Sequence, residues 1–491
     1  RDYKVTGVQT CALPISYFIS LFILFVFGLH GFTMIFYYNK YKNVKPTPKE
    51  SISYDEVVTI QLPLYNELYV VERLINAVCE IDYPKDKLEI QVLDDSTDET
   101  VNITANIVNE KAKLGFDIKH VRRASREGFK AGALKEGMRT ARGEYIAIFD
   151  ADFIPHKDFL KKTLSFFTDQ KVGMVQTRWE HLNGDYSLLT KAQALALDGH
   201  FVIEQSVRNK AGFFINFNGT GGVWRRACIE DAGNWHADTL AEDLDLSYRA
   251  QLNGWRFVYL KDYTSPAELP AEITALKTQQ FRWTKGHIET AKKMLPHVWK
   301  SKIPLRIKMQ ATVHLTSNFV FPFILLAAIL NVPLTFIKNS GSHELYFGFM
   351  SIFVLAFISS FMFYLYSQKD IRADWRKKIV LFPLFMAGSM GFAVNNSRAV
   401  IEGLLSRKSE FVRTPKFKVV DGKDKVEGNK YLNKKIEPGV IVELIMAIYC
   451  LIGIASSIYF VEIAALPFQL LFFFGFSFVS ITSLKHALSK K

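Results

Sequence analysis

The chain has 491 residues, 49% of them hydrophobic, and a formal net charge of +13. This length is enough for a folded domain with a full core, and the apolar residues gather toward the two ends of the chain. The basic residues lie mainly beside apolar runs, which indicates a membrane surface rather than nucleic acid as their partner. Four cysteines, Cys11, Cys79, Cys228 and Cys450, show no paired or metal-ligand spacing, so we expect reduced thiols.

The N-terminal segment divides into two parts. Residues 1–15 look like a translated sequencing adapter, so we expect an artefactual leader and infer no function from it. Residues 16–39 form an apolar run that is followed by lysines such as Lys40, Lys42 and Lys45. A cleavable signal peptide carries its charge in front of the apolar run. The pattern therefore predicts a transmembrane helix with its C-terminal end in the cytoplasm.

Residues 50–300 are predicted to form an α/β domain. Strands are expected at Val57 to Pro63, Leu88 to Leu93, Asp117 to Val121 and from Tyr145 onward, with helices between them. This alternation predicts a mainly parallel sheet with helices on both faces. Ligands of such sheets bind beyond the C-terminal ends of the strands. No glycine-rich dinucleotide fingerprint follows the first strand and no Walker sequence occurs, which argues against a dehydrogenase.

Two of these strands end in carboxylates. Asp94 and Asp95 follow the second strand, and Asp150 and Asp152 follow the apolar run from Tyr145. In an extended backbone, the side chains of Asp150 and Asp152 would point to the same side of the strand and bind one divalent cation together. Mg²⁺ or Mn²⁺ held in this way takes its other ligands from water and substrate phosphates, which suggests a nucleotide diphosphate as ligand. An ordinary surface turn is the alternative for an isolated Asp-x-Asp.

Three further motifs carry groups suited to phosphate and sugar chemistry. Lys130 lies at a predicted helix start, where the amide groups and the dipole favour an anion. Asp243 lies at another helix start; an aspartate with an ordinary pKa near 4 is ionised at pH 7 and can accept a proton. The pattern formed by Gln279, Arg282 and Trp283 supplies an amide and a guanidinium for phosphate oxygens and an indole face for a sugar. Surface or amphipathic helices without a ligand are the alternative for each motif alone.

Taken in order, these motifs resemble the processive membrane glycosyltransferases of glycosyltransferase family 2, the cellulose-synthase-like group, in its mannan and glucan synthase-like branch. The residues that carry the resemblance are Pro63 to Glu67, Asp94-Asp95, Lys130, Asp150-Ala-Asp152, Asn218-Gly-Thr-Gly-Gly222, Asp243 and Gln279 to Trp283. Ala241 replaces the threonine that usually precedes the Glu-Asp pair. Phe411 to Lys416 is similar to the Phe-x-Val-Thr-x-Lys gating loop of that group, with Val and Arg in altered positions.

The resemblance implies a GT-A fold, that is, a Rossmann-like α/β domain joined to an α-helical transmembrane region. It implies inverting transfer of a hexose from UDP-glucose or GDP-mannose to a glycan or lipid acceptor, with Mg²⁺ or Mn²⁺. The residues implied for the donor are Pro63, Tyr65, Glu67, Asp95, Lys130, Gln279 and Arg282. Those for the acceptor are Asn218, Gly219, Thr220 and Trp283; for the metal, Asp150 and Asp152; for catalysis, Asp243 and Arg282; for the gating loop, Phe411, Thr414 and Lys416.

Residues 305–370 and 440–485 are each predicted to contain two transmembrane helices. The apolar segment between them is short and has a basic cluster at each end. If this segment crossed the membrane, one of the two clusters would lie on the outer side, against the positive-inside bias. We therefore predict that 372–406 is an interfacial helix and 407–436 a gating-like cytoplasmic loop. The expected protein is a multi-pass protein of the cytoplasmic or inner membrane, with its catalytic domain in the cytoplasm, membrane lipid as a partner and no nucleic acid.

The second predicted span carries four polar residues, His314, Thr316, Ser317 and Asn318. Polar groups at membrane depth face either a neighbouring helix or a water-filled path, and we predict that these line a conduit for a growing glycan. Two alternatives stay open for the whole chain. One is a non-processive enzyme that adds a single sugar to a lipid, and the other is a channel or transporter with an inactive nucleotide-sensing domain.

Overall fold

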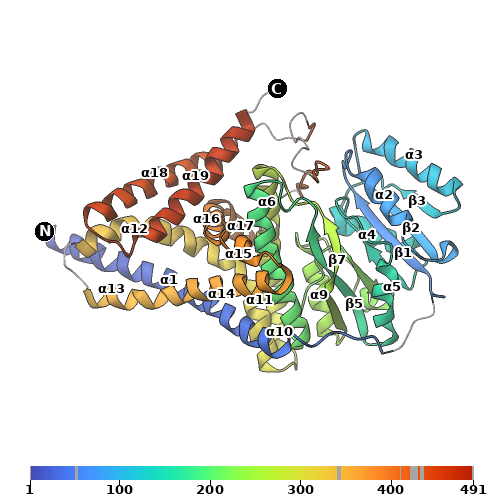
Figure 1. The fold of residues 1–491 in the computed structure, drawn as a ribbon, viewed down its shortest axis with the longest axis horizontal. Helices are drawn as coiled ribbons and strands as arrows, with labels where there is room; N and C mark the ends of the chain where they lie inside the picture. Colours follow the sequence, from blue (N-terminus) through green and yellow to red (C-terminus); the bar gives the residue numbers. More distant parts are fainter. Residues whose placement is uncertain are drawn as a thin grey trace.

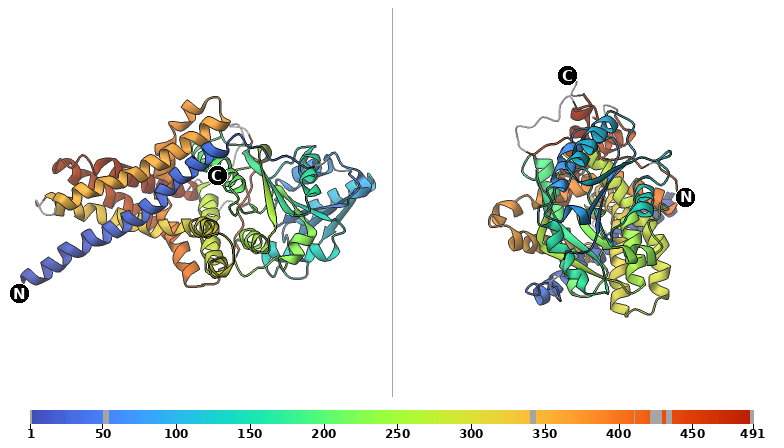
Figure 2. Two further views of the ribbon diagram at one scale, coloured as in Figure 1. Left: turned by 90° about the horizontal axis from the view of Figure 1, so that it is seen from below. Right: turned by 90° about the vertical axis from the view of Figure 1, so that its right-hand side faces the viewer.

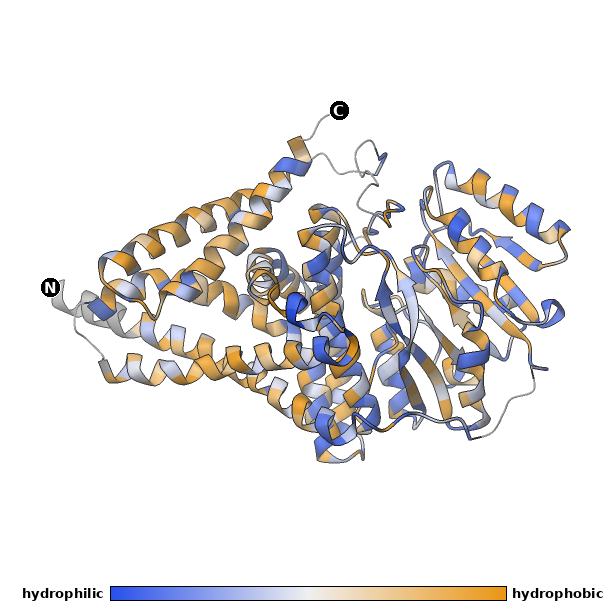
Figure 3. Cartoon of the chain, viewed as in Figure 1, coloured by the Kyte–Doolittle hydropathy of each residue, from blue (hydrophilic) through white to orange (hydrophobic). Residues whose placement is uncertain are grey.

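A sheet domain lies at one end of the elongated molecule and a bundle of long helices at the other (Figure 1). The computed structural model describes residues 2–49, 54–339, 344–409, 411–420, 429–431 and 436–488, with the backbone alone for residues 2–11 and 344. Colouring by hydropathy separates the two ends, because the helical bundle is almost uniformly apolar and the sheet domain is mixed (Figure 3). The predicted leader, residues 1–15, joins the first helix as backbone from Asp2 onward.

The sheet domain contains one mixed sheet of seven strands, in the order β3-β2-β1-β4-β6-β5-β7. The strands are β1 Val58–Leu64, β2 Leu88–Asp94, β3 Asp117–Val121, β4 Tyr145–Ile148, β5 Val172–His181, β6 Gly222–Arg225 and β7 Arg256–Ala267. The first four are parallel to one another, as the alternation of strands and helices along the chain predicted. β6 runs antiparallel to β4 and to β5. The second half of the sheet is therefore mixed.

Helices cover both faces of the sheet. Apolar side chains of α2, α3 and α5 pack on one face, and those of α4, α8 and α9 pack on the other. Their bounds are α2 Val71–Cys79, α3 Thr100–Lys113, α4 Phe129–Thr140, α5 Phe159–Leu164, α8 Arg226–Asp231 and α9 Glu242–Leu252. Strand residues such as Ile60, Ile90 and Ile146 are fully buried between these layers. The central strands thus form a rigid frame whose C-terminal ends are fixed in space.

The C-terminal ends of β1, β2 and β4 meet at one edge of the sheet. The Asp95 amide donates to the Leu64 carbonyl at 3.0 Å, and the Phe149 amide donates to the Gln61 carbonyl at 3.2 Å. These bonds hold the segments after the three strands side by side. Residues that are far apart in the sequence, from Pro63 to Asp152, are brought to the same edge in this way.

A second group of helices connects the sheet to the bundle. It consists of α6 Leu188–Asp198, a π-helical segment Gly199–Gln205, α7 Ser206–Lys210 and the long α10 Ile273–Lys300. α6 packs against α14 and α16 of the bundle, and α10 packs against α17 and α11. The motif Gln279 to Trp283 therefore lies on a helix that contacts both halves of the molecule.

Five helical segments in the described part of the chain are long and apolar enough to cross a membrane: Ala12–Tyr41, Leu305–Asn339, Leu345–Ile371, Pro438–Tyr459 and Leu466–Leu488. The helices that form these segments are α1 Asp2–Tyr41, α11 Leu305–Thr316, α12 Val320–Asn339, α13 Glu344–Met350, α14 Val354–Ile371, α18 Pro438–Tyr459 and α19 Leu466–Leu488. Figure 2 shows α1 crossing beside α14 along the bundle, and the contacts agree. Length and composition establish no more than this capacity.

The segment predicted as an interfacial helix, 372–406, is divided into α15 Trp375–Ile379, α16 Phe382–Gly391 and α17 Ala393–Leu404. Trp375–Gly391 and Ala393–Leu404 meet at a bend of 46°. Both ends of this bent pair contact the sheet domain or α10. Lys378 Nζ lies 2.5 Å from Asp185 at the first end, and Lys292 Nζ donates to the Leu404 carbonyl at 2.7 Å at the second.

Candidate active site

A cavity of about 430 Å³ opens at the edge of the sheet where β1, β2 and β4 end. α10 and the segment from Phe411 also line it. The site residues expected from the sequence line it, with one exception: Pro63, Tyr65, Glu67, Asp95, Lys130, Asp150, Asp152, Asn218, Gly219, Asp243, Gln279, Arg282, Trp283, Phe411, Thr414 and Lys416. Segments separated by up to 350 residues thus contribute to one pocket.

The exception is Thr220, which was expected at the acceptor. It is fully buried and does not line the cavity. Its hydroxyl oxygen accepts a hydrogen bond from the Asp150 amide at 2.9 Å. This bond ties the loop of residues 216–222 to the segment that carries Asp150.

The backbone at Asp150 and Asp152 does not have the extended conformation that the sequence predicted. β4 ends at Ile148, and the Phe153 amide donates to the Asp150 carbonyl at 3.1 Å, so the two acids lie in a turn. The inference from extended backbone was wrong, because the chain bends as soon as the strand leaves the sheet. Asp150 Oδ1 accepts from Lys130 Nζ at 2.5 Å, and Asp152 Oδ2 accepts from Lys416 Nζ at 2.6 Å.

The donor set at this turn fits a divalent cation. Two carboxylates line the same cavity, and the side chain of Asp150 is 35% exposed to it. Hard oxygen ligands of this kind suit Mg²⁺ or Mn²⁺, which complete their coordination with water and phosphate. Another group in the described chain that could hold a cation, His236 with Asp238 and Asp245, lines no part of this cavity.

Asp243 lies in the first turn of α9 and is oriented by the backbone. Its Oδ1 accepts from the Leu244 amide at 2.8 Å. Its Oδ2 faces Gly219, where a Cβ atom would lie 3.1 Å from Oδ2 and 3.4 Å from Lys130 Nζ. Gly219 also has a φ of +79°, which side chains rarely adopt. A glycine therefore keeps open the space between the candidate base and the lysine.

The surroundings of Asp243 change its acidity. Burial and the nearby Glu242 carboxylate raise the pKa of Asp243 to about 7, against the opposing effect of Lys130. The residue type alone predicted an ordinary aspartate pKa, and that prediction was wrong. A carboxylate with a pKa near neutrality is well matched to general base catalysis, because both of its protonation states are accessible.

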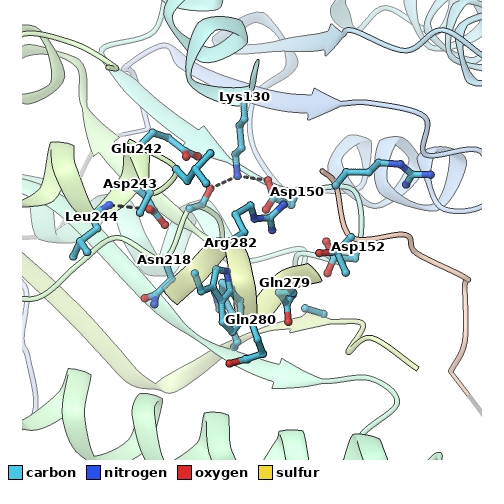
Figure 4. A pocket seen from close by; sticks show the side chains of 18 of the residues that line it. Lys130, Asp150, Asp152, Asn218, Glu242, Asp243, Leu244, Gln279, Gln280 and Arg282 are labelled. Carbon is cyan, nitrogen blue, oxygen red and sulfur yellow. Dashed lines mark hydrogen bonds and ion pairs between the residues drawn. The ribbon is translucent and has the colours of Figure 1, made fainter. Parts of the chain in front are cut away.

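Arg282 lies on α10 at the centre of the group. Figure 4 shows its side chain between Asp243 and Asp150, with Lys130 bonded to Asp150. Its guanidinium lies 4.5 Å from the centroid of the Phe411 ring, and Nη1 donates to the Val412 carbonyl at 3.4 Å. Two cations, Lys130 and Arg282, are therefore close to the same acids, as a site for phosphate groups requires.

The segment from Phe411 to Val420 covers the cavity. The Phe411 ring stacks on Phe129 with centroids 5.7 Å apart, and Arg413 lies 3.0 Å from Glu67 Oε2. Thr414 is buried, and the Phe417 amide donates to Glu268 Oε1 at 2.9 Å. The other parts of the expected gating-like loop, residue 410 and residues 421–428 and 432–435, lie outside the described residues.

Residues 56–286 match the profile of the glycosyltransferase-like family 2. They form a domain of this family. The resemblance inferred from the sequence is thereby confirmed for the glycosyltransferase domain.

Named relatives agree with this assignment. Glucomannan 4-beta-mannosyltransferase 1 of Oryza sativa subsp. japonica is 42% identical over 277 residues, which are 55% of this chain and 53% of the relative. Glucomannan 4-beta-mannosyltransferase 2 of Arabidopsis thaliana is 41% identical over 270 residues, or 54% of this chain and 50% of the relative. The chain spans about half the length of the curated relatives that it matches.

A solved structure supports the fold. The mannosyltransferase PcManGT from Pyrobaculum calidifontis, solved in complex with GDP-Man and Mn²⁺, superposes with a TM-score of 0.53 at 19% sequence identity. The match covers 79% of this chain and all of that one. The predicted GT-A α/β fold, with helices able to span a membrane beside it, is confirmed.

The glycosyltransferase domain also brings to the cavity a basic residue that was not selected from the sequence. Arg126 lies 3.4 Å from the centroid of the Tyr65 ring and lines the cavity beside Asp95. Asp95 accepts from Arg123 Nε at 3.0 Å. The arginines just before Gly128 could have been selected from the sequence, because cations that precede a helix start are well placed to bind phosphate.

The cavity continues from Asp243 toward the helical bundle. His314, Ser317 and Asn318 line it, whereas Thr316 donates to the Thr312 carbonyl at 2.7 Å and does not. Three of the four polar residues selected on this span therefore share one cavity with the candidate base. The polar residues His200, Glu204 and Arg208 also line it and were missed, because they stand singly in the sequence among apolar residues.

Proposed function

We propose that this protein transfers a hexose from a nucleoside diphosphate sugar to a glycan, with inversion at the anomeric carbon, at a membrane surface. The observation that carries the proposal is the convergence of Asp243, Lys130, Asp150 and Arg282 on one cavity. A base, two cations and a carboxylate pair are the groups that such a transfer needs. The family 2 match over residues 56–286 supports the same reaction class.

The donor that we infer is GDP-mannose, and the product a β-1,4-linked mannan or glucomannan. The relatives in rice and Arabidopsis are named as glucomannan 4-beta-mannosyltransferases. The structural neighbour is a mannosyltransferase solved with GDP-Man and Mn²⁺. Both observations favour mannose over glucose as the transferred sugar.

In the reaction, Asp243 takes the proton from the acceptor hydroxyl as its oxygen attacks the anomeric carbon. The bond from that carbon to the diphosphate oxygen breaks, and the nucleoside diphosphate leaves from the opposite face. An α-linked donor therefore gives a β-linked product. Lys130 and Arg282 stabilise the negative charge that grows on the leaving phosphate in a cavity with little water. A divalent cation bound by Asp150 and Asp152 would neutralise part of the same charge.

The remaining site residues follow from their places in the cavity. Tyr65, Asp95 and the turn from Pro63 to Glu67 lie at the end of β1 and β2 and are assigned to the nucleoside. Trp283 follows Arg282 on α10 and is assigned to stacking on the acceptor sugar. Phe411, Thr414 and Lys416 belong to the segment that covers the donor end.

We infer that the domain lies on the cytoplasmic side of the membrane. Lys378 and Lys292 attach the two ends of the bent pair, Trp375–Gly391 and Ala393–Leu404, to the sheet domain and α10. A segment whose two ends lie on the same side of the membrane is not a single membrane span. The basic residues at both ends then lie together with the domain, as the positive-inside bias favours. With this geometry, the cavity that reaches Asn318 leads toward the bundle and is assigned to export of the glycan.

The test is a panel of nucleotide sugars offered to the purified protein with Mg²⁺ or Mn²⁺. We expect GDP release from GDP-mannose, and a long product that a β-1,4-mannanase digests. Release of nucleoside diphosphate from none of the donors would contradict the proposed function. Transfer of a single sugar to lipid would replace it with the non-processive alternative, and UDP release from UDP-glucose alone would change the assigned donor.

A further inference from the structure

One wall of the cavity is built on a π-helical segment, Gly199–Gln205. The wider turn of a π-helix inserts an extra residue into a helix, and such insertions are frequent at functional sites. Here the segment lies between α6 and α7 and carries His200 and Glu204, which line the cavity together with Arg208 on α7. The reaction proposed above assigns no role to these three residues.

Hydrogen bonds join this cluster to the loop of residues 216–222. His200 Nδ1 lies 2.9 Å from Glu204 Oε2, and His200 Nε2 lies 3.2 Å from the Asn218 side-chain amide nitrogen. Because the carboxylate can only accept, His200 donates from Nδ1 and accepts from Asn218 at Nε2. Asn218 is also held by Gln205, whose amide donates to Asn218 Oδ1 at 2.7 Å. The cluster is therefore fixed next to Gly219 and Asp243.

Glu204 remains charged in this setting. Burial acts to raise its pKa, but the hydrogen bond from His200 and the positive charge of Arg208 outweigh burial and lower the pKa of Glu204 to about 2. From the residues that the structure describes, its carboxylate accepts one close hydrogen bond, so it retains capacity for further donors. An anion at this place would be repelled, which argues against a second phosphate site.

Arg208 is the least satisfied member of the cluster. Its side chain is 4% exposed, and its Nη2 lies 3.8 Å from Glu204 Oε1, too long for a strong hydrogen bond. Nε is buried, with no partner in the described part of the chain. Leaving a buried guanidinium without acceptors is costly, so a ligand that supplies oxygen atoms would stabilise it.

We propose that His200, Glu204 and Arg208 form a subsite for one hexose of the acceptor glycan, next to the sugar whose hydroxyl is attacked. A neutral sugar supplies hydroxyl groups that donate to Glu204 and accept from Arg208. The Trp179 indole lines the same cavity, and its N–H is buried without a partner among the described residues. An indole face beside polar groups suits a sugar ring. This inference rests on the proposed function for the identity of the acceptor.

The test compares Glu204→Gln with the wild type in a membrane preparation of the full chain. The probes are a β-1,4-linked manno-oligosaccharide as acceptor and GDP-mannose as donor. Loss of a charged hydrogen-bond acceptor should raise the KM for the oligosaccharide by about tenfold or more, with kcat changed much less. Hydrolysis of GDP-mannose by water and the KM for GDP-mannose should stay as in the wild type. Glu110→Gln, which removes the same charge on the exposed face of α3, is the matched control.

A second measurement separates this inference from the proposed function. Binding of the oligosaccharide without donor, followed by tryptophan fluorescence, should weaken in Glu204→Gln and in Arg208→Lys. A wild type that binds the oligosaccharide through Glu204 but releases no GDP from GDP-mannose would overturn the assigned reaction and support the subsite. An unchanged oligosaccharide affinity in Glu204→Gln, or an equal loss of donor hydrolysis, would overturn the subsite.

Discussion

Asp243 shares the cavity with a second acid, Glu242, and with the ammonium of Lys130. Burial and Glu242 raise its pKa to about 7, while the Leu244 amide orients one of its oxygens. The Gly219 backbone leaves space beside the other oxygen. At the scale of single residues, the surroundings of Asp243 therefore bring its pKa closer to the value that suits a general base than the aspartate residue type does.

Replacing Asp243 with Asn should lower kcat by about 10²–10⁴-fold, because the variant cannot accept the proton. In the wild type, kcat/KM should rise with pH through an apparent pKa near 7, since only the ionised carboxylate is a base. The assay is GDP release from GDP-mannose at pH 5.5 to 8.5.

Two controls accompany this prediction. GDP binding should be retained in Asp243→Asn. Because the folded-state pKa is raised from 3.8 to about 7, Asp243 lowers the stability of the fold as the pH rises between these two values, and the whole loss remains above about pH 7. The variant should therefore unfold at the same or a higher temperature at pH 8, and a strong fall would assign the lost activity to misfolding instead.

At the scale of secondary structure, each site residue depends on where an element ends. Lys130 is the second residue of α4, and Asp243 is the second residue of α9. Asp150 and Asp152 come directly after β4. Helix starts and strand ends can be read from local sequence, and this is why these residues could be selected before the structure placed them on one cavity. The turn that Asp150 and Asp152 adopt depends on contacts with the Thr220 loop, which local sequence does not reveal.

The short helical break at Ser317–Phe319 brings polar side chains of the second span to the cavity. Asn318→Leu places an apolar side chain in the path that we assign to the glycan. We expect a shorter product while transfer of the first sugar continues, because Asp243 and the donor end are untouched. Thr316→Val is the matched control, since Thr316 bonds within its own helix. Product of unchanged length from Asn318→Leu would reject the conduit.

At the scale of the whole molecule, one buried ion pair joins the glycosyltransferase domain to the helical bundle. Lys277 on α10 lies 2.8 Å from Glu443 on α18, and the two side chains are 4% and 0% exposed. The Lys277 carbonyl also accepts from the Asn395 side chain of α17 at 3.1 Å. α10 is thus held against two helices of the bundle by polar contacts inside an apolar interface.

Lys277→Met should destabilise the protein by about 3–5 kcal/mol, because it leaves the Glu443 carboxylate buried without its cation. The measured result would be a lower unfolding temperature in detergent. Lys277→Met combined with Glu443→Leu should recover most of the loss, since apolar pairs replace buried ion pairs well. Lys300→Met, on the exposed end of α10, is the control. Equal unfolding temperatures for the wild type and Lys277→Met would show that the pair contributes nothing to the interface.

Local sequence was sufficient for the first four strands, the helices between them, the helical segments able to span a membrane and the selection of site residues that, except for Thr220, line the cavity. Hydrophobic periodicity, helix starts and strand ends are properties of short segments, and they report on elements one at a time. The antiparallel β6, the turn at Asp150, the raised pKa of Asp243 and the cluster of His200, Glu204 and Arg208 were decided only by tertiary structure. Each depends on residues distant in the chain, whose burial and charge act on a group only after folding places them beside it.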